Sequence, residues 1–384
     1  MRFRRFTWVV SVLASASLAC GGDESTDVPY SPDFDAGLDA ETDTVLPDVV
    51  HESGVEEASP DAPVEDTGGP SGPLGFIGSP CEGVAECDFD EAVCLTESDG
   101  FPAGHCSMPC DNTCPDRDGH PTTFCIEATE IAAPMPEGAC VSRCDMGLFP
   151  ETGCRPGYGC VLLPRANESE TQTYACVPGR PSELTPCHLE LAARGVSFEP
   201  AYIADQSPDT HPNLTCHVEE PVYVHSPLHG VTLASSGGTE TPRVLASCAM
   251  AHALTDTIDD VAPLGVVTLR HMGTFNCRVI AGTDSLSRHA FGDAIDIAGF
   301  ELSDGSLYTL VDDWEHDTDS PQTAAGAFLY EAAHRWYDAW IWTIILTPNY
   351  NVDHDDHFHV DLTPESHFVE FHGGHFIGPA PYAD

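Results

Sequence analysis

The chain has 384 residues, and its 62 acidic side chains against 14 basic ones give a formal net charge of −48. This charge excludes nucleic acid as a natural partner, because phosphate binding requires a basic face. The length is sufficient for one sizeable domain together with smaller segments. Composition alone therefore leaves an enzyme, a binding module and a surface scaffold all open.

Residues 1–20 have the pattern of an export signal. Three arginines precede the apolar stretch FTWVVSVLASASLA, which is too short to span a membrane. The following SLAC and GG resemble a bacterial lipoprotein signal, in which Cys20 is lipidated after cleavage; ordinary cleavage near Ala19 is the alternative. Lipidation would leave 16 of the 17 cysteines, an even number for pairing. Because glycine follows Cys20, we expect an outer-membrane lipoprotein facing the periplasm or the exterior, with a secreted protein as the alternative.

Residues 21–75 form an acidic segment. They contain 15 Asp and Glu and no Arg. Such a composition cannot bury enough apolar surface to become ordered, and its like charges repel one another. We interpret the segment as a disordered linker that holds the folded regions away from a membrane. A calcium-binding tract is the alternative, but it would need a regular ligand spacing that the segment lacks.

Residues 76–182 are rich in cysteine and poor in apolar side chains. Twelve cysteines lie between positions 81 and 176, and disulfides would replace a hydrophobic core here. GHCSMPC and GACVSRC resemble two copies of one small element, and TFCIEA and YGCVLL are candidate strands that close each copy. A zinc ribbon would require Cys-x2-Cys pairs and a reducing compartment, and the sequence indicates neither. We predict a disulfide-bonded module with a binding or spacing role, whose connectivity the sequence does not give.

Residues 183–384 have the composition of a globular domain. Four widely spaced cysteines are expected to form disulfides around its core: Cys187, Cys216, Cys248 and Cys277. Hydrophobic periodicity predicts helices at 243–259 and 321–339, and strands at 265–272, 293–300, 340–346 and 357–362. This order predicts an α+β domain, with helices around an antiparallel sheet.

Histidine and aspartate share one strand face in two segments of this domain. Alternation puts Asp296 opposite core isoleucines, and it puts His357, His359 and Asp361 on one face of the last strand. A glycine between His289 and Asp296 would let both reach one point. Imidazole and carboxylate ligands suit Zn²⁺, and three protein ligands with an open position are typical of catalytic zinc. An ordinary solvated polar face is the alternative.

A resemblance supports the metal interpretation. SRHAFGDAID, at residues 287–296, fits the Ser-x-His-x-x-Gly-x-Ala-x-Asp motif of the zinc D-alanyl-D-alanine peptidases, a superfamily that includes the lysostaphin-type endopeptidases and the hedgehog fold. HDDHFHVD resembles the paired His-x-His element of the same superfamily. FNCR, IAGFELSDG and LTPNYNVDHDDHFHVDL resemble the extensin-like C-terminal family more closely, over residues 185–365.

Carried over by position, the resemblance implies that His289, Asp296 and His359 bind zinc. It leaves two candidates for the general base. His357 corresponds to a histidine beside the metal in the endopeptidase branches. Asp356 occupies the position of a glutamate in the D-alanyl-D-alanine branch and is one carbon shorter.

The resemblance also implies roles for residues around the metal. Arg278 lies near the position of a substrate- or oxyanion-binding arginine, although a surface arginine is equally expected there. Ser287 would bind substrate or hold its loop. His354 adds a third histidine to the final motif, and Asp361 is a candidate acceptor behind a ligand histidine.

The function implied is a zinc-dependent peptidase that acts on a peptidoglycan stem peptide or cross-link, as a D,D-carboxypeptidase or an endopeptidase. The first alternative is a non-catalytic zinc module that binds cell wall or protein, because the glutamate is missing. The second is a surface lipoprotein in which the cysteine-rich region matters most. The remaining histidines singled out by the sequence are expected to be packed (His252, His271 and His334) or to form a second metal site as a minor alternative (His367, His372 and His375).

Overall fold

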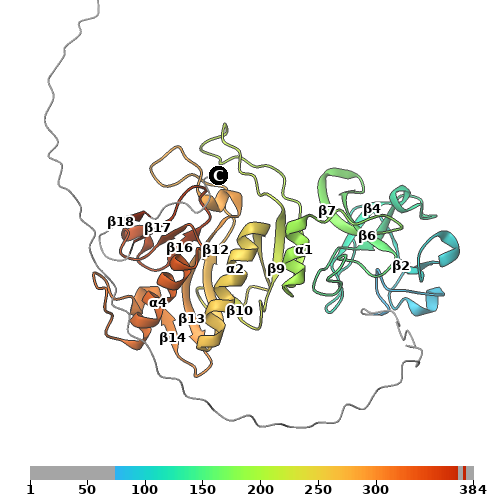
Figure 1. The fold of residues 1–384 in the computed structure, drawn as a ribbon. Coiled ribbons are helices and arrows are strands. Elements are labelled where there is room, and N and C mark those ends of the chain that lie inside the picture. Colours follow the sequence, from blue (N-terminus) through green and yellow to red (C-terminus); the bar gives the residue numbers. More distant parts are fainter. Residues whose placement is uncertain (1–73, 371–374, 378–384) are drawn as a thin grey trace, which may run out of the picture. The chain divides into compact units, whose positions relative to one another are not determined.

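The computed structural model describes residues 74–370 and 375–377 (Figure 1). The predicted export signal, Cys20 and the acidic segment up to residue 73 lie outside these ranges, as does His372. Within the described ranges, every helix is too short or too polar to cross a membrane.

The cysteine-rich region is built from short antiparallel strands. Its sheets have the orders β1-β2, β3-β5-β4 and β6-β7. The predicted strands TFCIEA and YGCVLL are confirmed as β4 and β6. The strands are β1 (Val93–Leu95), β2 (His105–Ser107), β3 (Pro109–Cys110), β4 (Thr123–Glu127), β5 (Gly138–Ser142), β6 (Tyr158–Arg165) and β7 (Glu168–Pro178), with 3₁₀ turns η1 (Val84–Glu86), η2 (Glu97–Asp99) and η3 (Ala128–Ile131).

The cysteines of this region form three successive quartets, and not the two copies expected from the sequence. In each quartet the first cysteine pairs with the third and the second with the fourth. The third and fourth cysteines also lie directly opposite each other on paired strands. In GHCSMPC and GACVSRC, Cys106 and Cys140 therefore end one quartet, and Cys110 and Cys144 start the next. The bonds are Cys81–Cys94 and Cys87–Cys106, Cys110–Cys125 and Cys114–Cys140, and Cys144–Cys160 and Cys154–Cys176.

The C-terminal domain contains an eight-stranded sheet with the order β10-β12-β13-β16-β15-β17-β18, in which β14 pairs with β13. The pairs β10/β12 and β15/β17 are parallel, so the predicted antiparallel sheet is mixed. A long crossover that contains α2 separates β10 from β12, which is the connection that parallel neighbours require. A separate three-stranded antiparallel sheet has the order β11-β9-β8, and β10 of the large sheet lies between β9 and β11 in the chain.

The elements of this domain follow in chain order: α1 (Pro186–Ala193), β8 (Phe198–Pro200), β9 (Pro221–His225), β10 (Thr232–Ser235), β11 (Arg243–Ser247), α2 (Cys248–Val261), η4 (Ala262–Leu264), β12 (Val266–Gly273), η5 (Arg288–Phe291), β13 (Ala294–Leu302), β14 (Leu307–Thr309), α3 (Leu310–Asp313), α4 (Ala324–Asp338), β15 (Ile344–Leu346), η6 (Val352–His354), β16 (Phe358–Asp361), β17 (Phe368–Glu370) and β18 (His375–Ile377).

The helix predicted at 243–259 begins five residues later than expected, because residues 243–247 pair with β9 as strand β11. The helix starts where Ser247 caps it, since its Oγ accepts a hydrogen bond from the backbone N–H of Met250 at 3.0 Å. The predicted helix at 321–339 is confirmed as α4, and the predicted strand at 340–346 is shortened to β15.

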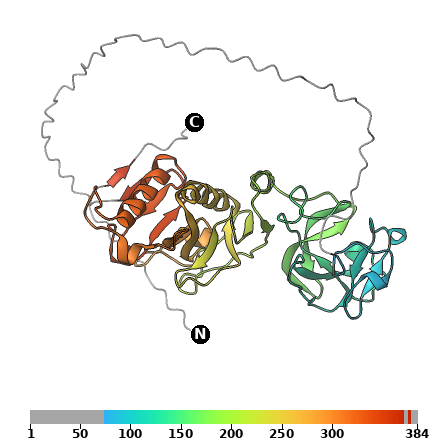
Figure 2. The same ribbon diagram turned by 90° about the horizontal axis from the view of Figure 1, so that it is seen from below.

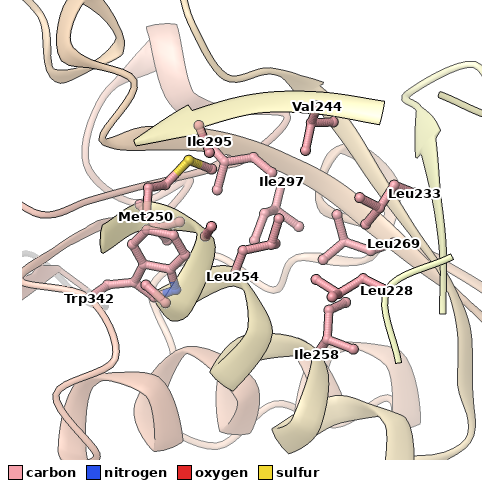
Figure 3. Close-up of a cluster of buried hydrophobic side chains, with 14 of the residues drawn as sticks. Leu228, Leu233, Val244, Met250, Leu254, Ile258, Leu269, Ile295, Ile297 and Trp342 are labelled. Carbon is pink, nitrogen blue, oxygen red and sulfur yellow. The ribbon is translucent and has the colours of Figure 1, made fainter. Parts of the chain in front are cut away.

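Helices α2 and α4 lie side by side on one face of the sheet (Figure 1 and Figure 2). An ion pair between Arg335 of α4 and Asp260 of α2, at 3.0 Å, links them. Figure 3 shows α2 directing Met250, Leu254 and Ile258 toward apolar residues of the surrounding strands. Each fully buried side chain of this size contributes about 1.5–3 kcal/mol to folding.

The core fixes which way strand β13 faces. Ile295 and Ile297 are fully buried in the core (Figure 3), so alternation directs Asp296 to the other face of the sheet. Two disulfides brace the domain: Cys187–Cys248 joins α1 to α2, and Cys216–Cys277 holds the segment that follows β12. These bonds repeat the pairing of first with third and second with fourth cysteine.

Candidate metal centre

Two neighbouring strands bring together the first two residues of the site. In the antiparallel pair β13/β16, Asp296 lies directly opposite His359. Their side chains share the sheet face that points away from the core, as the alternating pattern predicts. Ala294 and Ala298 flank Asp296 on the same face of β13 and leave space around its carboxylate.

A short turn before β13 carries the third residue, His289. The turn η5 starts at Ser287, whose Oγ accepts a hydrogen bond from the backbone N–H of His289 at 3.4 Å. It ends at Gly292, which has a φ of +65°, and a Cβ at this position would lie 2.9 Å from Val218 Cγ1. A glycine is therefore required where the chain turns from His289 into β13.

The three side chains converge on one point. His289 Nε2 lies 3.1 Å from Asp296 Oδ1 and 3.2 Å from His359 Nδ1, and His359 Nδ1 lies 2.9 Å from Asp296 Oδ1. Ligand atoms around tetrahedral zinc, with bonds of about 2.1 Å, are separated by about 3.4 Å. Three atoms with lone pairs at such short separations require a proton or a cation between them, so the donor set fits a metal ion.

Each histidine of the cluster has an acceptor behind it, to which the N–H of its other ring nitrogen can donate a hydrogen bond. His289 Nδ1 contacts the carbonyl oxygen of Thr274, and His359 Nε2 lies 2.9 Å from Asp361 Oδ2. A ring that carries a single proton can keep it at these contacts, away from the cluster, so that His289 Nε2 and His359 Nδ1 can act as ligands. Asp361 is thus the hydrogen-bond acceptor behind His359.

The electrostatics of the cluster favour a cation. Burial acts to raise the pKa of the Asp296 carboxyl, but hydrogen bonds from His289 and His359 hold that pKa well below its usual range. Burial acts to lower the pKa of His359, but hydrogen bonds to Asp296 and Asp361 raise it to about 9. Both shifts stabilise positive charge in the cluster, whether a proton or a metal ion carries it.

His357 lies beside the cluster and belongs to a separate pair. Its Nε2 is 3.6 Å from Asp296 Oδ1, and its Nδ1 is 2.8 Å from Asp356 Oδ1. Asp356 is half-exposed and contacts this histidine. The two candidates for the general base are thus one unit, in which the imidazole lies nearer to the cluster and the carboxylate orients it.

His354 lies beyond this pair. Its ring centroid is 5.2 Å from that of His357 and 6.0 Å from that of His359. Its Nδ1 is 2.7 Å from Asn351 Oδ1. Burial and the neighbouring histidines lower the pKa of His354 to about 4, so this ring is neutral at pH 7.

Arg278 and Ser287 lie at the two ends of the loop before η5. The Arg278 side chain is exposed, and its carbonyl oxygen accepts a hydrogen bond from the backbone N–H of Ser287 at 3.0 Å. Ser287 is buried, with 3% of its surface exposed, and it caps η5. This position favours the loop-holding role of Ser287 over contact with substrate.

The other histidines with described side chains lie apart from the cluster. His252 contacts Arg194, and His334 packs on Tyr330. His367 stacks against Tyr337, with ring centroids 3.8 Å apart. His271 is buried in β12, and burial lowers its pKa. These contacts agree with the expectation of packed histidines and extend it to His367.

Among the described residues, five groups of His, Cys, Asp or Glu are close enough to hold a metal ion, and four of them contain cysteines already bonded in disulfides. The remaining group is His289, Asp296 and His359. Residues 185–369 match the family described as extensin-like protein C-terminus. The matched region therefore contains the whole cluster, His357 and both long-range disulfides. Comparison with curated proteins and with solved structures gave no match.

Two contacts around the cluster were missed by sequence reasoning. Thr274 acts through its main-chain carbonyl, so its side chain carries no signal. Asn351 orients His354 from the turn η6. An asparagine that precedes a histidine by three residues is a weak signal, because this spacing also occurs in ordinary turns.

Proposed function

We propose that residues 183–384 form a zinc-dependent peptidase domain that acts on peptidoglycan peptides, at a stem terminus or a cross-link. The observation that carries the proposal is the cluster of His289, Asp296 and His359, with a histidine–aspartate pair beside it. The Asp296 side chain is 17% exposed, so solvent reaches the cluster. Three protein ligands with solvent access are the pattern of catalytic zinc sites, whereas structural sites have four protein ligands.

The residues around the cluster suit hydrolysis of a peptide bond. Zinc held by the three ligands would polarise a carbonyl group and lower the pKa of water toward about 7. His357 would accept the proton of the attacking water at Nε2, the ring nitrogen that faces the cluster. Asp356 would hold the Nδ1 proton of the same ring and keep Nε2 available.

Arg278 would serve the substrate side of the reaction. Its exposed guanidinium is carried by a loop whose base is held by the Ser287 hydrogen bond and by the adjacent Cys216–Cys277 disulfide. An arginine in this position would bind the terminal carboxylate of a stem peptide or the negative charge that develops on the carbonyl oxygen.

One observation favours a second function, a zinc module that binds wall peptides without cleaving them. The carboxylate of Asp356 contacts His357 and is half-exposed. Asp356 occupies the position of the glutamate base in the D-alanyl-D-alanine branch, but its carboxylate is engaged with His357. Turnover distinguishes the two functions, because both require the metal.

The test uses the full chain purified from an oxidising compartment. Bound zinc is measured by mass spectrometry, and purified peptidoglycan is then incubated with the protein and its soluble products are identified. We expect one zinc per chain and release of D-alanine or of cleaved cross-links, both lost in His359→Ala. His217→Ala is the matched control, since His217 also pairs with an aspartate, at 2.6 Å, but lies outside the cluster. Zinc without products would favour the binding module, and absence of zinc would refute both functions.

We also propose that the chain is exported and anchored through a lipid on Cys20, with peptidoglycan as its partner. The disulfides of the described region support an oxidising location outside the cytoplasm. Labelling with a radioactive fatty acid should tag the wild type and leave Cys20→Ser untagged. An untagged wild type recovered from the medium would indicate a secreted protein.

A further inference from the structure

A pocket outside the metal cluster is lined by arginine, tyrosine and threonine side chains. Its volume is about 320 Å³, which is within the range of small-molecule sites, about 300–1,000 Å³. The lining residues come from the cysteine-rich region and from strands β9 and β11 with the loop after β8. The pocket shares no lining residue with the cluster of His289, Asp296 and His359.

Positive charge is concentrated at this pocket. Arg143, Arg165 and Arg243 all line it, although the whole chain has only 14 basic residues and a net charge of −48. One carboxylate, Asp116, also lines it, and its Oδ1 accepts a hydrogen bond from the backbone N–H of Thr123 at 2.7 Å. Among the lining residues three arginines therefore accompany one carboxylate, and Glu199 and Glu168 beside the arginines balance the remaining charge.

The protein satisfies these guanidinium groups only in part. Arg143 and Arg243 share one acceptor, Glu199 Oε2, at 3.2 and 3.1 Å. Arg165 pairs with the half-exposed Glu168 at 3.1 Å. In the part of the chain that the structure describes, the Nε atoms of Arg143 and Arg165 have no hydrogen-bond acceptor. These Nε atoms are buried, so they are not donors to a ligand. Each arginine offers five donors, and the ion pairs above engage one terminal nitrogen of each guanidinium, so the other terminal nitrogens are the donors for a bound anion.

The remaining lining suits a sugar ring. Tyr202 is 38% exposed and offers an aromatic surface, whereas the ring of Tyr223 is covered by the Arg243 guanidinium at 4.3 Å. Four threonines and a glutamine provide hydroxyl and amide groups that can bond to sugar hydroxyls. An acidic peptide would engage the arginines but would make little use of this combination of ring and hydroxyls.

We propose that this pocket binds a sugar ring that carries a carboxylate group, as in uronic and muramic acids. The carboxylate lies against the arginines, and the ring lies on Tyr202 beside the threonines. Binding here is separate from hydrolysis and does not require the metal.

The test measures binding by isothermal titration calorimetry with the full chain. N-acetylmuramic acid and N-acetylglucosamine serve as probes, because they differ only in the carboxylate-bearing lactyl group. We expect at least tenfold tighter binding of N-acetylmuramic acid, and at least a fivefold loss in Arg165→Gln and in Tyr202→Ala. Arg180→Gln is the matched control, since Arg180 also pairs with a glutamate three residues later, at 3.5 Å, and lies outside the pocket. This variant should bind as the wild type does.

Three results would overturn the proposal: equal affinity for the two sugars, no measurable binding of either, or a hexa-aspartate peptide that binds as tightly as N-acetylmuramic acid and is insensitive to Tyr202→Ala. The last result would identify an acidic-peptide site. His359→Ala should retain binding of N-acetylmuramic acid. Failure of this proposal is therefore distinguishable from failure of the peptidase.

Discussion

Replacement of Asp361 by Asn tests how the residues behind the ligands control the cluster. Asp361 Oδ1 accepts a hydrogen bond from the backbone N–H of Thr363 at 2.8 Å, and Oδ2 accepts one from His359 Nε2 at 2.9 Å. An asparagine that keeps the Thr363 bond presents its NH₂ group to His359. The imidazole proton must then move to Nδ1, the atom that faces the cluster. A protonated Nδ1 cannot bind a metal ion.

The magnitude follows from this contact. The bond joins a buried carboxylate to a ligand imidazole, and hydrogen bonds to charged groups contribute about 1.5–3 kcal/mol. Loss of a partner behind a metal ligand lowers metal affinity by about 10- to 100-fold, equivalent to about 1.4–2.7 kcal/mol. We therefore expect zinc to bind at least tenfold more weakly to Asp361→Asn, in competition with a chromogenic chelator at pH 7.5.

Asp356→Asn is the matched control, since this aspartate lies behind His357, which is not a proposed ligand. Its zinc affinity should stay within about threefold of wild type, because no ligand tautomer changes. Circular dichroism and the thermal midpoint should show that both variants are folded. Equal losses of affinity in the two variants, or no loss in Asp361→Asn, would refute the assignment of roles to the two aspartates.

Three further predictions concern the fold. Gly292→Ala should lose about 1–3 kcal/mol of unfolding free energy in urea and should weaken zinc binding, because φ is positive and the new Cβ meets Val218; Gly282→Ala, at a φ of +75° in open space, should leave zinc binding unchanged. Burial, aided by the charge of Arg155, lowers the pKa of His105 to about 3. The unfolded chain therefore binds a proton at His105 more readily than the folded protein does. The free energy of unfolding is highest above pH 6.5 and decreases as the pH falls from 6.5 toward 3, by about 3 kcal/mol at pH 4.5. Urea midpoints at pH 7.5 and 4.5 should differ less in His105→Leu, and an unchanged difference would contradict this account. Trp342→Ala should lose about 3–5 kcal/mol in the same assay, since the ring is fully buried; a loss below about 1 kcal/mol would show that the core does not depend on it.

The sequence predicts the site residues of β13 and β16 because strand alternation is a local property. Ile295 and Ile297 face the core, so the position of Asp296 follows from counting alone. His289 in η5 could be assigned to the same site because Gly292 lets the chain turn between this histidine and β13. The pairing of Asp296 with His359, 63 residues later, depended on a resemblance, since strand register between distant segments is not encoded locally.

Other features could not be predicted for the same reason. Residues 243–247 have a helix-compatible pattern and become a strand because β9 lies beside them. The two parallel strand pairs depend on crossovers that local periodicity does not specify. The Arg165 and Arg243 side chains meet in one pocket although 78 positions separate them (243 − 165). Composition gave no indication of this, because the chain as a whole is strongly acidic.

The uniform disulfide connectivity has a consequence for how the protein is made. All sixteen bonded cysteines belong to four quartets, and in each the partners are the first with the third and the second with the fourth. An oxidase that joins cysteines in the order in which they emerge from a translocon would make the wrong bond in every quartet. Correct bonds then form only through exchange, by attack of a free thiolate on a mispaired disulfide. Oxidation in the order of emergence would therefore have to be followed by thiol-disulfide exchange, the reaction that an isomerase catalyses.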